Sequence, residues 1–137
     1  VGTPVIEVRV DFVAACPYAS RAPYETWILS RAHDASFEHY AMAHPQSMRD
    51  LAALLRRTLQ RIRSITESFH LVIHTSPNKS HASASLGYWK TLDDDYHWHI
   101  EIMPSLMQVA GFEWGSGFYI NPTPPEEAAK FLREIDG

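Results

Sequence analysis

Cysteine is nearly absent from this sequence, in which Cys16 is the only one among 137 residues. A lone cysteine excludes both a disulfide framework within the chain and a zinc cluster built on cysteines. Long apolar runs are missing too, because no stretch approaches the roughly 18 residues that a membrane-spanning helix requires. The first ten residues alternate like a strand and do not resemble a secretory signal. We therefore expect a soluble, cytoplasmic protein that does not bind membranes.

Basic residues are not in excess, since 12 lysines and arginines face 16 acids, for a formal net charge of −4. Such a chain has no general basic surface, so nucleic acid is not an expected partner. Hydrophobic residues make up 45% of the sequence, which is enough to bury a core in a chain of this length. Repeats and linker-like stretches are also lacking, and we expect residues 1–137 to form a single domain.

Hydrophobic periodicity predicts both strands and helices. From Ser47 onward, apolar residues recur every three or four positions as far as Ile65, which predicts a long helix with Ser47 and Asp50 as its capping box. A short C-terminal helix is predicted to start near Thr123. This order of elements favours an α+β fold with a mainly antiparallel sheet. The predicted strands are residues 5–10, 12–15, 26–29, 69–75, 96–103 and 118–120.

Two polar or glycine-rich segments interrupt these elements. Residues 76–95 are predicted to form a long loop of the kind that is usually functional or mobile. Residues 111–117 contain three glycines, which suit a phosphate-cradling loop, a hairpin or a bulge equally well. The arginines of the long helix favour a solvated helix face over a phosphate-binding ridge. They are Arg49, Arg56, Arg57, Arg61 and Arg63.

The segment 96–104 carries the strongest chemical signal in the sequence. Strand alternation places His97, His99 and Glu101 on one face, with apolar residues between them on the other. If the strand at 69–75 is a neighbour, His74 joins this polar face. His74, His99 and Glu101 would then form a set of two histidines and one carboxylate, which suits zinc or ferrous iron. Each of these groups alone is typical of a sheet surface, but together they favour a site.

The remaining candidates are weaker. Cys16 is expected to be a buried apolar group, because the sequence around it has no base that could activate a nucleophile. Glu113 lies between two aromatic residues, an arrangement that can grip sugar hydroxyls. The other histidines have no partners at ligand spacing and are expected at the surface or in loop packing. They are His33, His39, His44, His70 and His81.

Several stretches of this chain resemble the galactose-1-phosphate uridylyltransferase family. The clearest are His-Thr-Ser-Pro at 74–77 and Tyr-His-Trp-His-Ile-Glu-Ile-Met-Pro at 96–104. The likeness covers roughly residues 12–135 and is to the C-terminal half of the family's proteins. It implies a histidine-triad-like fold. Residues 16–29, 110–121 and 124–134 carry the rest of it.

The resemblance also implies roles for individual residues. His74 and His99 match histidines that help to bind a divalent metal in some members, where Glu101 replaces a further histidine. The residues themselves leave three roles open for His97, which would be another ligand, a support for one, or a bystander. Glu113 and Asn121 match sugar-contacting positions that reach the active site of a neighbouring subunit, which implies a homodimer.

The family's nucleophilic histidine lies in a His-Pro-His motif of the other half, and this chain has no such motif. We therefore expect a domain of galactose metabolism that binds a nucleotide or UDP-sugar and lacks full transferase activity alone. An alternative comes from the wider histidine-triad superfamily, whose middle strand histidine attacks the α-phosphate of a nucleotide. His99 would then be the nucleophile of an autonomous phosphohydrolase or nucleotidyltransferase. A third hypothesis is a metal-dependent enzyme that uses His74, His99 and Glu101 for other chemistry.

Overall fold

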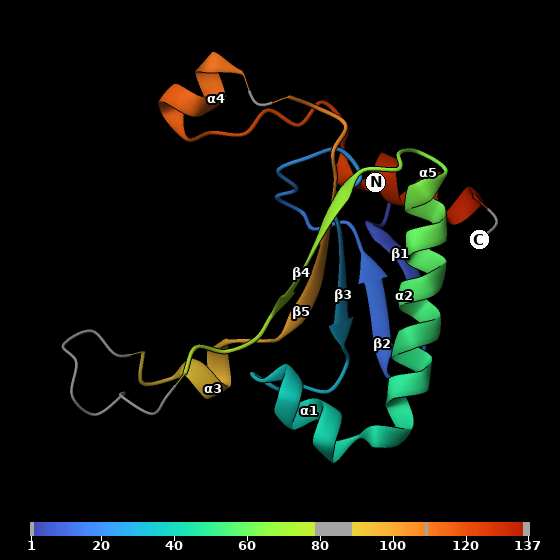
Figure 1. Cartoon of the computed structure of the whole chain (residues 1–137), viewed down its shortest axis with the longest axis vertical. Coiled ribbons are helices and arrows are strands. Elements are labelled where there is room, and N and C mark those ends of the chain that lie inside the picture. Colours follow the sequence, from blue (N-terminus) through green and yellow to red (C-terminus); the bar gives the residue numbers. More distant parts are fainter. Residues whose placement is uncertain (1, 79–88, 109, 136–137) are drawn as a thin grey trace.

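A computed structural model describes residues 2–78, 89–108 and 110–135 of the chain (Figure 1). Its five strands form one sheet of order β1-β2-β3-β5-β4, in which every neighbouring pair is antiparallel. The predicted α+β class is confirmed. The strands are β1 (Val5–Val8), β2 (Phe12–Ala15), β3 (Thr26–Ser30), β4 (Phe69–His74) and β5 (His99–Pro104). The helices are α1 (Phe37–Ala43), the 3-10 turn η1 (Pro45–Ser47), α2 (Met48–Arg63), α3 (Leu92–Asp95), α4 (Gly111–Ser116) and α5 (Pro125–Glu134).

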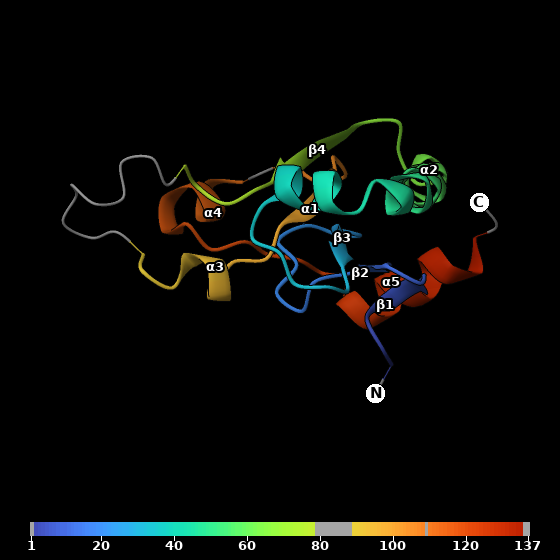
Figure 2. The same cartoon turned by 90° about the horizontal axis from the view of Figure 1, so that it is seen from below.

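The helices cover the sheet from both sides. In Figure 2, α1 and α2 lie on one side of the sheet and α5 lies on the other. The long helix α2 buries Leu54 and Ile62 completely, as its three-and-four periodicity predicts. On β5, the predicted apolar face is confirmed, since Ile100 and Ile102 are buried in the core together with the preceding Trp98. The polar residues His99 and Glu101 therefore point away from α2.

Burial differs sharply between the two neighbours of β5. Its inner neighbour β3 alternates between buried and half-buried residues. The edge strand β4 leaves Leu71, Val72 and Ile73 38%, 38% and 43% exposed, so its apolar side chains are only partly covered. An edge strand with apolar side chains of this exposure is unusual in a chain without a partner. Among the described residues, no helix is both long and apolar enough to cross a membrane.

Several predicted local structures are corrected by the structure. The capping box of α2 does not form, because the Ser47 hydroxyl donates to the Asp11 carboxylate (2.6 Å) and Asp50 accepts from Arg9 (3.1 Å). The predicted loop 76–95 ends in helix α3, while residues 79–88 lie outside the described part of the chain. The predicted strand at 96–103 begins only at His99, because the Tyr96 N–H still donates to the Leu92 carbonyl of α3 (2.9 Å).

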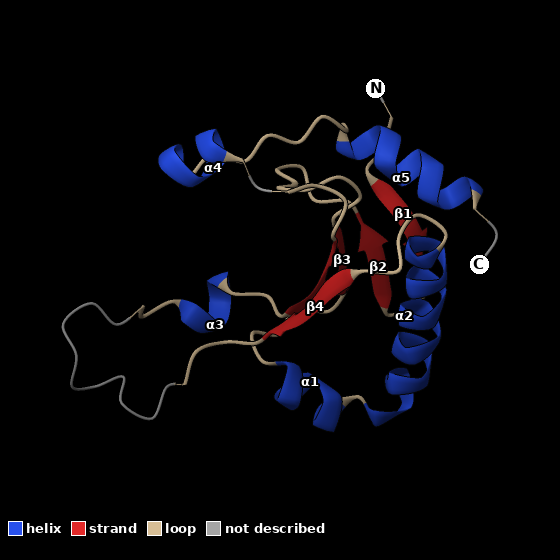
Figure 3. Cartoon of the chain, turned by 45° about the horizontal axis from the view of Figure 1, so that its top comes forward, coloured by secondary structure: helices blue, strands red, loops and turns tan. Residues whose placement is uncertain are grey.

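The glycine-rich segment 111–117 is helix α4 and not a loop, hairpin or bulge. The Glu113 carboxylate accepts from the Ala110 N–H (2.9 Å) and supports the first turn of α4, and Gly117 ends it in the left-handed region at φ 73°. The predicted strand 118–120 is absent, because these residues belong to a projecting arm and none of the described strands lies beside them. Figure 3 shows α4 at the end of this arm, which comprises residues 105–108 and 110–123, apart from the sheet.

Candidate functional site

Three strands position the candidate site on the sheet face that points away from α2. The β4–β5 register sets His74 opposite His99, and the β3–β5 register sets Trp27 opposite Glu101. The side chains of His74, His99 and Glu101 converge so closely that one ligand atom from each lies within 4.8 Å of the others. The structure thus brings together the three residues whose spacing suggested a metal site.

Glu101 is the centre of this cluster. It is 3% exposed, and its Oε2 atom lies 2.6 Å from His74 Nε2. Its other oxygen, Oε1, accepts a hydrogen bond from the Arg21 guanidinium. A buried carboxylate is tolerated when both oxygens are paired in this way. Burial raises the pKa of Glu101, but the His74 hydrogen bond and the Arg21 charge hold that pKa below its usual value.

His99 is held between two flat side chains. Its ring stacks on the Trp27 indole (centroids 4.3 Å apart) and on the His74 imidazole (4.7 Å). Its Nδ1 atom lies 3.1 Å from the His97 carbonyl, an acceptor, so we assign the proton to Nδ1. Burial lowers the pKa of His99 and the neighbouring His74 lowers it further, which favours the neutral ring. A neutral ring with Nδ1–H presents a lone pair on Nε2, the atom that binds metals or attacks phosphorus.

His97 is separated from the other three residues. Its Nε2 atom lies 3.0 Å from the Ser30 hydroxyl, and its ring meets the edge of the His33 ring at 5.2 Å. Since the Ser30 hydroxyl already donates to the Ala32 carbonyl, His97 donates to Ser30. Strand alternation does not hold at His97, because it precedes the first residue of β5. Its backbone carbonyl still contacts the site, because it accepts the hydrogen bond from His99 Nδ1 and so orients the His99 ring.

Glu113 lies on the arm and Asn121 lies at its base. Both side chains form hydrogen bonds with backbone groups. The Glu113 carboxylate accepts from the backbone N–H groups of Ala110 and Ile120 (2.9 and 3.0 Å). The Asn121 amide donates to the carbonyls of Ser20 and Ala22, both at 3.2 Å, which ties the arm to the loop that carries Arg21. A cavity of about 150 Å³ lies between arm and sheet, and both Arg21 and Glu113 line it.

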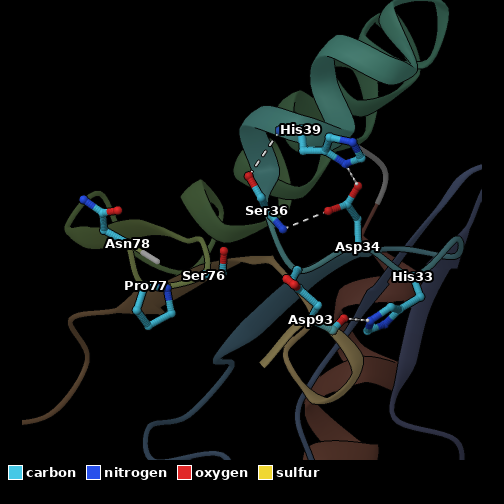
Figure 4. Close-up of a pocket in the computed structure, with 9 residues that line it drawn as sticks. His33, Asp34, Ser36, His39, Ser76, Pro77, Asn78 and Asp93 are labelled. Carbon is cyan, nitrogen blue, oxygen red and sulfur yellow. Dashed lines mark hydrogen bonds and ion pairs between the residues drawn. The ribbon is translucent and has the colours of Figure 1, made fainter. Parts of the chain in front are cut away.

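A larger cavity of about 690 Å³ was not indicated by the sequence (Figure 4). It lies where α1 begins, and in it His39 Nδ1 is 2.6 Å from the Asp34 carboxylate. His33, which also lines this cavity, contacts the Asp93 carbonyl (2.8 Å). Its ring also packs edge-on against the His97 ring, with 5.2 Å between the centroids. From the sequence, His33 and His39 have no partners at ligand spacing and are expected at the surface or in loop packing. In the structure, helix α1, which was not predicted from the sequence, brings the largely exposed His39 side chain to Asp34. His81 lies outside the described residues.

Cys16 is 1% exposed, and burial raises the pKa of its thiol to about 12. A thiol with such a pKa stays protonated at neutral pH and is a poor nucleophile. The residues around the site that sequence reasoning missed are Arg21, Glu25 and Trp27. All come from the segment 16–29 that carries the family resemblance, but none has a spacing that points to a site.

The chain is similar to longer proteins of known activity, although no protein-family model matches it. It is 38% identical to ADP-glucose phosphorylase of Arabidopsis thaliana over 133 residues, which are 96% of this chain and 35% of that protein. It is 22% identical to galactose-1-phosphate uridylyltransferase of Thermotoga maritima over 131 residues, or 91% of this chain and 38% of that protein. The chain thus spans little more than a third of the curated relatives it matches.

Comparison with solved structures shows that the similarity extends to the fold. The crystal structure of the Arabidopsis thaliana ADP-glucose phosphorylase with bound ADP-glucose matches 98% of this chain and 41% of its own, with a TM-score of 0.82 and 34% identity. A zinc-bound histidine triad family protein of Mycobacterium smegmatis matches 97% of this chain and 83% of its own, with a TM-score of 0.60. At 15% identity, the second likeness concerns the fold alone. By sequence and fold together, this chain has a histidine-triad-like fold and is similar to one part of longer proteins, an ADP-glucose phosphorylase and a galactose-1-phosphate uridylyltransferase.

Proposed function

We propose that this domain binds a nucleotide sugar and takes part in nucleotidyl transfer only together with residues that it does not itself contain. The observation that carries the proposal is the match of 98% of the chain to a relative crystallised with ADP-glucose. The chain has no His-Pro-His motif, so it lacks the family's nucleophile and is not expected to transfer a nucleotidyl group alone. A cytoplasmic location and a place in galactose metabolism remain predictions.

We infer that His74, His99 and Glu101 hold a divalent metal, zinc or iron. Two imidazoles and one carboxylate are a donor set that both ions accept, with positions left open for a further ligand. The short contact between His74 and Glu101 (2.6 Å) supports this, because a cation can replace the proton that these two groups share. A bound ion would supply positive charge to orient a phosphate oxygen. Arg21 would stay on the remaining oxygen of Glu101 and limit that side chain to one metal-binding atom.

His99 as a nucleophile is the second candidate function. Its Nε2 lone pair would attack the α-phosphorus of a nucleotide, forming an N–P bond while the bond from phosphorus to the leaving oxygen breaks. The proton on Nδ1 and its contact with the His97 carbonyl (3.1 Å) support this, since they leave Nε2 unprotonated. The same lone pair cannot bind a metal and attack phosphorus at once. Metal content therefore distinguishes the two roles of His99.

Two measurements test these functions. Titration calorimetry with ADP-glucose and UDP-glucose should show that the purified chain binds at least one of them. Mass spectrometry of the denatured chain after the same incubation should show no nucleotidyl adduct. Absence of any binding would contradict the binding domain, whereas an adduct that disappears in His99→Ala would favour the nucleophile.

We further propose that two copies of the chain associate through the arm. Support comes from the exposed aromatic residues of the arm: Phe112, Trp114 and Phe118 are 62%, 80% and 72% exposed. Apolar patches of this kind on a projecting segment mark interaction sites. The half-exposed edge strand β4 offers a second apolar surface for the same association. Sedimentation of the wild-type chain should give a dimer that Trp114→Ser weakens, and a wild-type monomer at high concentration would contradict the proposal.

A further inference from the structure

Glu25 is a buried carboxylate to which none of the proposed functions assigns a role. It begins the approach to β3 and is 1% exposed, with both of its oxygens engaged. The preceding residue Tyr24 has φ 61°, which makes it the only left-handed non-glycine residue in the described part of the chain. Such backbone conformations persist where the surrounding structure holds them, and they are common at functional sites. The turn at Tyr24 leads directly into Glu25 and so determines where its carboxylate lies.

The first oxygen of Glu25 anchors the side chain that stacks on His99. Oε1 accepts a hydrogen bond from the Trp27 indole Nε1–H at 3.0 Å. Trp27 is half-buried on β3, and its ring lies 4.3 Å from the His99 ring with 22° between the planes. An indole whose single N–H is bound to a buried carboxylate has a defined rotation about its side-chain bonds. Glu25 thus determines the orientation of the Trp27 ring. Because the His99 ring stacks on that ring, Glu25 also affects where His99 lies.

The second oxygen of Glu25 anchors the residue that neutralises Glu101. Oε2 accepts from the Arg21 backbone N–H at 2.6 Å, and the Arg21 side-chain Nε lies 3.9 Å from the same oxygen. The Arg21 guanidinium then donates to Glu101. The Arg21 side chain is 43% exposed, and besides these contacts it donates to Met103 Sδ (3.4 Å) and lies above the Tyr119 ring (5.9 Å).

We propose that Glu25 is a positioning residue that orients two of the three site residues at once, His99 through Trp27 and Glu101 through Arg21. The inference rests on the proposed metal-binding role of these residues. Outer residues that orient ligands contribute strongly to metal affinity, and their removal typically weakens binding about 10–100-fold. Because one buried carboxylate orients both His99 and Glu101, its loss should disturb both of these side chains together.

Glu25→Gln is the matched test, because glutamine keeps the size of the side chain but replaces one acceptor oxygen with an NH2 donor. One of the two N–H donors, on Arg21 or Trp27, then loses its partner. In the metal-free chain, the His99 ring protons should lose the upfield NMR shift that the stacked Trp27 ring imposes. In a competition with a chromophoric chelator, the Zn²⁺ affinity should fall about 10–100-fold. The His99 signals are identified by their loss in His99→Ala.

Glu7→Gln is the control, because Glu7 is also an ion-paired, largely buried carboxylate (16% exposed) but belongs to another part of the sheet. It should leave the His99 signals and the Zn²⁺ affinity unchanged. A folded Glu25→Gln protein with wild-type His99 signals and wild-type Zn²⁺ affinity would overturn the proposal.

Two further outcomes separate this inference from the function on which it rests. If the wild-type chain binds no Zn²⁺, the metal site fails, whereas the NMR shift of His99 still decides whether Glu25 positions that ring. If Glu25→Gln does not fold, Trp27→Phe removes the indole N–H together with its five-membered ring and keeps a smaller flat ring in place. Its Zn²⁺ affinity should fall several-fold, and an unchanged affinity would overturn the Trp27 branch of the proposal.

Discussion

Two charged clusters lie at different places on the same sheet, and their balance of charge is opposite. In the site cluster, two carboxyl groups, Glu25 and Glu101, share the single arginine Arg21. At the outer edge of the sheet, three arginines surround two acids: Arg9, Arg57 and Arg61 surround Glu7 and Asp50. Both clusters join carboxylates to arginines, so these residue types alone do not distinguish a site from a structural ion cluster. Burial is deeper at the site, where the side chains of Glu25 and Glu101 are 1% and 4% exposed, against 16% and 29% for Glu7 and Asp50.

The difference lies in the balance of cations and acceptors and not in the presence of an unpaired acceptor, since Asp50 Oδ2 in the outer cluster also has no hydrogen-bond partner among the described residues. Glu7 receives hydrogen bonds from Arg9 (3.0 Å) and Arg61 (2.7 Å), so its carboxylate has no need of another cation. In the site cluster, the His99 Nε2 lone pair and the oxygen that Glu101 shares with His74 remain for a cation to engage. A surplus of acceptors at short range identifies a binding site better than the number of charged residues does.

The largest expected effect is that of His74→Ala on the Zn²⁺ affinity of the site cluster. Removing one of three ligands should lower the Zn²⁺ affinity by more than about 100-fold, since loss of a supporting residue alone costs 10–100-fold. The chelator competition that measures this affinity has a control on the same strand, His70→Ala, because His70 is exposed and pairs with Met103 outside the cluster. Equal Zn²⁺ affinities for the two variants would remove the distinction between the clusters.

Glu7→Gln should have a smaller effect, on stability alone. Burial raises the pKa of Glu7, but the Arg61 hydrogen bond and the charges of Arg57, Arg61 and Arg9 hold it below the usual 4.5. Because the folded-state pKa is depressed, this stabilisation is complete above pH 4.5 and is lost as the pH falls through the folded-state value. At pH 7 the variant should be about 1.5–3 kcal/mol less stable, the range for hydrogen bonds to charged groups.

Urea unfolding at a series of pH values measures both parts of this prediction. The gap in the free energy of unfolding between wild type and Glu7→Gln should shrink steadily as the pH is lowered below 4.5. A gap that does not depend on pH would mean that Glu7 stabilises the edge of the sheet by packing and not by its charge.

Much of the site follows from local sequence, and the reason is strand geometry. The alternation of His99 and Glu101 with buried Ile100 and Ile102 is a property of any half-buried strand, so the polar face was predictable. His74 needed only the assumption that its strand is a neighbour of β5, which the register confirms. His97 was placed wrongly on that face, because alternation applies only within the strand and the turn of α3 before it delays the start of β5.

Errors elsewhere share one cause, which is that the outcome depends on distant residues. Residues 118–120 have strand-like composition, but a strand needs a paired edge and the arm provides none. Ser47 has the sequence of a helix cap, but its hydroxyl binds Asp11, which is distant in the chain and unseen in the local pattern. A tertiary contact at Ser47, and the lack of a partner strand at 118–120, each override a local preference worth about 1 kcal/mol.

Four features could be predicted from local sequence alone: the α+β class, the long helix, the apolar core of β5, and the common face of His99 and Glu101. These depend on periodicity, which each segment carries alone. Other features depend on how the chain folds: Glu25, Arg21 and Trp27 surround these two side chains, His97 lies against Ser30, and Arg57 and Arg61 of α2 bind Glu7. Hydrogen bonds and ion pairs of this kind join residues 54 and 80 positions apart as readily as neighbours, because they require only proximity in the folded chain.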